Sequence, residues 1–125
     1  MENLTLEEKQ QSVEAFHSII RKSEKALSHM KPDAPQTKLL AKRMKAARVG
    51  VGTLLARWEG LELEVCRTDL IEAKKELESV LLTLPSFLNK TKEGSGQWTY
   101  MTRRMKALTV AMIYMDDLIE KLEEA

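Results

Sequence analysis

The fold is decided by the stretch that runs from Trp98 to Leu122, WTYMTRRMKALTVAMIYMDDLIEKL. Its large apolar side chains recur at alternating steps of three and four residues. The members of this stripe are Trp98, Met101, Met105, Leu108, Met112, Met115, Ile119 and Leu122. Because positions three and four residues apart share one face of an α-helix, the pattern predicts one long helix with a single buried stripe.

An earlier stretch of the chain repeats this pattern. Arg104-Met105-Lys106-Ala107 has the same four residues as Arg43-Met44-Lys45-Ala46, which lie 61 positions earlier. At the same offset, one apolar stripe aligns with the other: Leu40, Met44, Ala47, Val51, Leu54 and Trp58 with Met101, Met105, Leu108, Met112, Met115 and Ile119. We therefore predict an internal repeat of two helical hairpins, residues 4–59 and 61–122. Gene duplication explains the match, and so does convergence on a helical pattern.

Capping residues and breakers set the expected ends of the other helices. Thr5 and Glu8 have the spacing of a capping box, so the first helix should begin there. The prolines of Lys31–Pro35 should end it, and Asp33 is a good cap for the second helix. Gly60 should end the second helix in a left-handed conformation and so precede the third.

These signals together predict an all-α fold in a single domain, residues 1–125. With 43% hydrophobic residues the chain can form a folded core, and only short segments are rich in glycine or proline. Short connections favour antiparallel neighbours, so we expect an up-down-up-down antiparallel four-helix bundle. Gly50 and Gly52 fall within the second helix, where close approach of a neighbouring helix or a kink would explain them.

Bulk composition narrows the class of protein. The net charge of +1 gives no general attraction to nucleic acid or membranes. The single cysteine cannot form an internal disulfide, the first residues do not resemble a signal peptide, and no apolar run is long enough to span a bilayer. We therefore expect a cytoplasmic protein without membrane insertion.

Basic residues concentrate near the expected starts of the second and fourth helices. The candidates for binding an anionic partner are Lys38, Lys42, Arg43, Lys45, Arg103, Arg104 and Lys106. In an up-down-up-down bundle these two starts lie at the same end, which predicts one basic end of the molecule. The alternative is a solvated face whose bases pair with acids of neighbouring helices: Glu14, Glu24, Glu76 and Glu78.

A second apolar face is predicted around the fourth helix. On a helix, residues 107–115 are apolar around almost the whole circumference, and Val110, Ile113 and Tyr114 point away from the main stripe. A monomeric bundle would leave these three side chains in water. Self-association into a homodimer would cover them, although ordinary exposed apolar residues are the alternative.

The sequence contains no constellation typical of an enzyme, a cofactor site or a metal site. His17 and His29 are too far apart to form a local metal pair, and we expect both at the surface. Cys66 falls on the core stripe, which predicts a buried and inert thiol. Gly50-Val51-Gly52 lacks the rest of a dinucleotide motif. We therefore expect no catalytic residue, no cofactor and no metal.

The segment Trp58-Glu59-Gly60 lies in an expected turn between helices. It is similar to the Trp-x-Gly turn of the small secreted helical hairpins of the WXG family. The likeness covers only the central hairpin, since this chain adds a helix on each side. It implies a secreted helical protein, whereas the internal repeat explains Trp58 as a core residue.

The function expected from these patterns is binding. The first hypothesis is a small adaptor, inhibitor or immunity-type regulator whose basic end docks an acidic protein surface. The second is a nucleic-acid-associated protein that contacts phosphates with the same bases. No aromatic residue accompanies the bases of the second helix to stack on nucleobases, which favours the protein partner.

Overall fold

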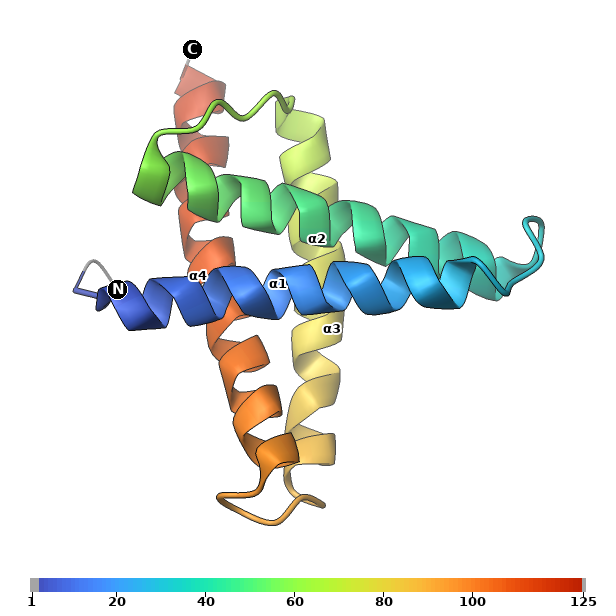
Figure 1. Ribbon diagram of the computed structural model, residues 1–125. Helices are drawn as coiled ribbons and strands as arrows, with labels where there is room; N and C mark the ends of the chain where they lie inside the picture. Colours follow the sequence, from blue (N-terminus) through green and yellow to red (C-terminus); the bar gives the residue numbers. More distant parts are fainter. Residues whose placement is uncertain (1–2, 125) are drawn as a thin grey trace.

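The computed structural model describes residues 3–124, and these form four α-helices without a β-strand (Figure 1). The helices are α1 (Leu6–Leu27), α2 (Pro35–Glu59), α3 (Arg67–Leu88) and α4 (Gly96–Glu124). They pack against one another as a four-helix bundle made of two antiparallel hairpins, so the predicted all-α fold class is confirmed. Met1, Glu2 and Ala125, which the predicted domain includes, lie outside the described residues.

Two of the predicted helix ends, at Thr5 and Gly60, are confirmed. Thr5 accepts a hydrogen bond from the backbone N–H of Glu8, and the Glu8 carboxylate accepts one from the backbone N–H of Thr5, which completes the capping box. Gly60 ends α2 with a φ of 69°, a left-handed conformation that glycine adopts without strain. The prediction for Asp33 is wrong, because Ala34 occupies the N-cap of α2 and supplies no side-chain cap.

The connection after Gly60 is longer than predicted. Residues 61–66 form no helix, and α3 begins only at Arg67. Cys66 is therefore not a core residue: it is exposed at the N-cap of α3, where its Sγ accepts a hydrogen bond from the Asp69 N–H at 3.4 Å. Its expected burial is wrong because the helical stripe starts after this residue.

The two hairpins cross steeply instead of lying side by side (Figure 1). Helices α1 and α2 run together across the view, and α3 and α4 run together behind them in a nearly transverse direction. Helix α1 packs on α2 and α4, and α2 packs on α3 and α4, whereas the backbones of α1 and α3 stay farther apart, with no Cα pair within 8 Å among the described residues. Each hairpin therefore extends past the crossing as an arm that ends in its connecting loop.

The core lies at the crossing, where the middles of α2 and α4 meet. Its completely buried side chains are Phe16, Ala47, Leu54, Leu70, Ala107, Leu108, Val110, Ala111 and Met115. Gly50 lies within this region, and a Cβ built on it would stand 2.6 Å from Cε1 of Phe16. A Cβ on Gly52 would stand 2.8 Å from Cδ1 of Leu63. Close approach of neighbouring helices therefore explains Gly50, as expected, whereas the side chain close to Gly52 belongs to the connection between α2 and α3.

The predicted self-association face is wrong. Val110 is completely buried and Tyr114 is 4% exposed, and only Ile113 reaches the surface, at 40% exposure. The physical reason is the crossing of the hairpins. Helix α4 is covered by α3 on one side and by α1 and α2 on another, so the extra apolar residues are buried within one chain.

Candidate anion-binding site

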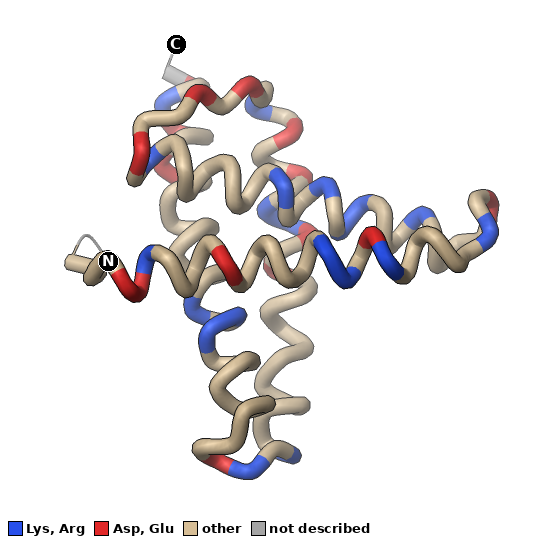
Figure 2. Tube along the Cα trace, viewed as in Figure 1, with Lys and Arg blue, Asp and Glu red and all other residues tan. Residues whose placement is uncertain are grey.

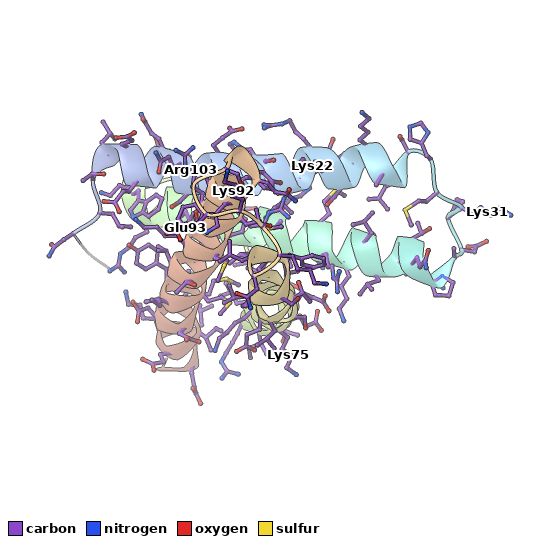
Figure 3. The ribbon with its side chains drawn as sticks, turned by 90° about the horizontal axis from the view of Figure 1, so that it is seen from below. Lys22, Lys31, Lys75, Lys92, Glu93 and Arg103 are labelled. Atoms are coloured by element: carbon purple, nitrogen blue, oxygen red, sulfur yellow. The ribbon has the colours of Figure 1, made fainter. Side chains whose placement is uncertain are left out.

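The single basic end predicted from the sequence does not form. The α1–α2 loop lies at the tip of one arm and the α3–α4 loop at the tip of the other, so the starts of α2 and α4 are far apart (Figure 1). In Figure 3, Lys31 marks the first tip and Lys92 the second, and they are separated along α1. The prediction fails because it assumes hairpins aligned side by side, whereas crossed hairpins carry their loops to different sides.

The basic residues gather instead on one arm. Figure 2 shows Lys and Arg concentrated on the part of the α1–α2 hairpin that carries its loop, whereas acidic residues cluster around the α2–α3 connection. Residues 21–48, which we name the basic segment, contain nine Lys and Arg and two acids. The bases are Arg21, Lys22, Lys25, Lys31, Lys38, Lys42, Arg43, Lys45 and Arg48, and the acids are Glu24 and Asp33.

Several candidates on α2 have acidic partners on other helices. Lys42 Nζ lies 3.2 Å from Glu76 Oε1 of α3, and Arg43 Nε lies 4.0 Å from Oε2 of the same carboxylate. Lys45 pairs with Asp69 at 3.8 Å. Lys38 is exposed and forms no ion pair with the residues that the structure describes. The predicted alternative, bases paired across helices, therefore holds for part of the set.

The three candidates on α4 lie in different surroundings. Arg103 is exposed, whereas Lys106 pairs with Glu8 of α1. The hydrogen bond from Lys106, together with those from the Thr5 backbone and hydroxyl, lowers the pKa of Glu8 from its ordinary 4.5 to about 2. Arg104 is half-buried and has no carboxylate within 4.0 Å among the described residues.

Arg104 belongs to a cluster around the Tyr100 hydroxyl that is not expected from the sequence. Arg104 Nη2 and Lys22 Nζ both donate to this oxygen, the latter at 2.9 Å, and Ser18 Oγ lies 3.3 Å from it. The two cations also lie over the Tyr100 ring, at 4.6 Å and 4.1 Å from its centroid. Its members lie on α1 and α4 and share no sequence pattern, so no local signal indicates the cluster.

The pKa values of this cluster follow from burial and charge. Burial raises the pKa of Tyr100, but the hydrogen bonds from Lys22 and Ser18 and the charges of Arg104 and Lys22 outweigh it, so the net pKa is lowered. Burial lowers the pKa of Arg104, and the opposing effect of Tyr100 is smaller. The positive charge of the half-buried Arg104 guanidinium is thus poorly compensated by the groups around it.

The crossing brings Arg43 and Arg104, the repeated arginines, to one cavity. This central cavity has a volume of about 160 Å³ and receives side chains from all four helices. Its lining residues are Ile19, Ser23, Leu40, Arg43, Ala47, Leu77, Val80 and Arg104. The Nε atoms of both arginines are buried and have no hydrogen-bond acceptor among the described residues. Two predicted site residues 61 positions apart are therefore brought together by the tertiary structure.

A larger open groove lies between α1 and the first turns of α4. Its volume is about 660 Å³, and Tyr100 and Arg103 line one wall while Gln11 and Ser18 line the other. Tyr100 thus faces this groove while its neighbour Arg104 lines the central cavity. Both hollows place cations and neutral hydrogen-bonding groups together, which suits an anionic or polar ligand.

Comparison of the chain with protein-family models, with curated proteins and with solved structures gave no match. Within residues 3–124, His, Cys, Asp and Glu form no group of three or more that could hold a metal ion. No helix of that part is both long and apolar enough to cross a bilayer.

Proposed function

We propose that this chain is a non-enzymatic interaction protein, an adaptor, inhibitor or immunity-type regulator, that docks an acidic surface of a protein partner. The observation that carries the proposal is the separation of charge. The basic segment has a net charge of +7, so the remaining residues of a chain of net charge +1 together carry −6. Such separation steers an oppositely charged partner toward one arm during encounter.

The exposed bases of the basic segment support docking at this arm. Lys25, Lys31 and Lys38 are exposed, and none of them forms an ion pair with a described residue. The arm extends beyond the crossing, so a partner can approach it without contact with α3 and α4 (Figure 1). Interfacial charge of this kind contributes chiefly to specificity and association rate.

A nucleic acid is the second candidate partner, and composition weighs against it. The basic segment contains no Phe, Trp or Tyr, so it offers no ring for stacking on nucleobases. Contacts to phosphates alone remain available, and these weaken steeply as salt rises. The two candidates therefore differ in a measurable salt dependence.

The repeat is part of the same proposal: we infer that the two hairpins derive from one duplicated hairpin. Helices α1 and α3 begin 61 positions apart, at Leu6 and Arg67, and so do α2 and α4. The ion pairs between Lys45 and Asp69 and between Lys106 and Glu8 are related by the same offset. We also propose that the protein is cytoplasmic, as the sequence leads us to expect.

The test measures binding of a fluorescent polyglutamate peptide and of a fluorescent DNA duplex across a range of salt concentrations. We expect wild type to prefer the peptide, and the double variant Lys31→Glu, Lys38→Glu to bind it about tenfold or more weakly, which corresponds to ~1.4 kcal/mol. The matched control Lys75→Glu, Lys121→Glu makes the same charge change outside the basic segment and should retain binding. Tighter binding of the duplex than of the peptide would support the nucleic-acid alternative, and equal losses in both variants would reject the arm as the docking surface.

A further inference from the structure

We propose that the central cavity between Arg43 and Arg104 binds a single phosphate-type oxyanion. The proposal concerns a small-ion site at the crossing of the hairpins and does not depend on what the exposed lysines of the basic segment dock. Its support comes from the size of the cavity, the local balance of charge and the buried donors that lack acceptors.

The size of the cavity fits one small ion. A water molecule takes up ~30 Å³ in the liquid, so the roughly 160 Å³ of the cavity have room for a few waters or one tetrahedral oxyanion. A nucleotide is far larger. The ligand is therefore a free oxyanion or a single phosphate group at the edge of a larger molecule.

The balance of charge at the cavity is positive. Glu76 is the carboxylate beside Arg43, but it also accepts the ion pair from Lys42. Arg104 has no carboxylate within 4.0 Å among the described residues, and burial lowers its pKa. A partly desolvated cation without a counter-charge is costly, and a bound anion removes that cost.

The asymmetry of the repeat explains why Arg104 lacks a carboxylate. At the offset of 61 that relates Arg43 to Arg104, the equivalent of Glu76 is Ala15. Helix α1 thus presents a methyl group where α3 presents an acid. Of two arginines in equivalent positions, Arg43 has a carboxylate partner within the chain, whereas Arg104 contacts only the neutral Tyr100 side chain and has no anionic partner among the described residues.

The donors at the cavity suit phosphate. The Nε atoms of Arg43 and Arg104 are both buried and donate to no described acceptor. A guanidinium presents its N–H groups as a planar fork that matches two oxygens of a phosphate. Two such forks on one small cavity favour a tetrahedral oxyanion, which offers acceptors in several directions, over a planar carboxylate. The buried Ser23 also lines the cavity and adds a hydroxyl group.

The test is a titration of the whole chain with inorganic phosphate at constant ionic strength, followed by the arginine Nε–H signals in ¹⁵N-correlated NMR spectra. We expect the Nε–H signals of Arg43 and Arg104 to shift in a saturable manner, with little response to acetate or chloride. The Arg104→Gln variant should lose at least about tenfold in phosphate affinity, whereas Arg103→Gln, with the same charge change on the next residue, should bind as wild type does.

Each outcome decides the proposal. Absence of a saturable shift, an equal response to chloride, or an equal loss in the Arg103→Gln variant would overturn it. A response to acetate as strong as that to phosphate would overturn the choice of ligand. If Arg104→Gln does not fold, Arg43→Gln and the wild-type titration still decide. Failure of this test leaves binding of polyglutamate at Lys31 and Lys38 unaffected, so the two proposals are judged separately.

Discussion

Gly50 of α2 packs directly against the ring of Phe16 of α1: a Cβ on Gly50 would stand 2.6 Å from Phe16 Cε1 and 3.2 Å from Leu77 Cδ1. Both of these side chains belong to the buried core, so neither moves away freely. We expect Gly50→Ala to lower the free energy of unfolding by up to about 2 kcal/mol, because overpacking costs ~1–3 kcal/mol and the gain in helix propensity offsets ~1 kcal/mol of it. Chemical denaturation followed by circular dichroism measures this change.

The control for this prediction is Gly96→Ala at the start of α4. No atom lies within 4 Å of a Cβ built on Gly96. Alanine there should leave stability unchanged or raise it by up to ~1 kcal/mol. A stabilising effect of Gly50→Ala equal to that at Gly96 would show that α1 and α2 do not approach each other as closely as the structure has them.

The pair of Glu8 and Lys106 predicts a dependence of stability on pH. The pKa of Glu8 is lowered to about 2 in the folded protein from an ordinary 4.5, so this group stabilises the fold above about pH 4.5. Its contribution should be lost progressively as the pH falls from about 4.5 to about 2. Thermal unfolding of Glu8→Gln across this window should show a shallower acid-induced decrease in Tm than wild type, whereas Glu7→Gln should retain the decrease.

The cluster around the Tyr100 hydroxyl predicts an early phenol titration. Because hydrogen bonds and nearby cations lower the pKa of Tyr100 below its ordinary 10.0, the ultraviolet signal of tyrosinate should begin to rise at a lower pH than for a free tyrosine. In Tyr100→Phe this early component should be absent. Lys22→Met, which removes one donor and one cation, should move it to higher pH. If the signal lost in Tyr100→Phe rose only at or above the pH at which a free tyrosine titrates, the cluster would be contradicted.

The crossed arrangement predicts which loops are distant from each other. A nitroxide label at Lys31→Cys, in a Cys66→Ser background, should broaden NMR signals of the α1–α2 loop and leave those of residues 92–96 sharp. Hairpins aligned side by side would bring both loops to one end, and signals of both would broaden. The reciprocal label at Lys92→Cys provides the control from the other arm.

Local signals in the sequence account for the helices themselves. The capping box at Thr5, the terminator at Gly60 and the stripe of α4 depend on residues a few positions apart, so they can be recognised without knowledge of the rest of the fold. The two local errors, at Asp33 and Cys66, displace a cap by one residue and a helix start by several. They arise because a cap depends on backbone geometry that residue type alone does not set.

Local sequence signals predict less of the candidate site. Arg43 and Arg104 are conspicuous in the sequence as members of a repeated tetrapeptide, but their convergence on one cavity depends on the crossing. Lys22 and Tyr100 lie on different helices and share no pattern, so nothing local indicates their contact.

By itself, the sequence determined the all-α class, the two hairpins and part of the buried stripes, because helical periodicity and capping act over a few residues. Only the tertiary structure determined the angle between the hairpins. This angle determines which charged residues lie together and which apolar residues are buried. An apolar stripe indicates which face of a helix is buried, but it does not indicate the direction of the helix that packs on that face. The apolar circumference of α4 at Val110 and Tyr114 is compatible with a second chain or with a crossed hairpin, and only packing of the whole core selects the latter.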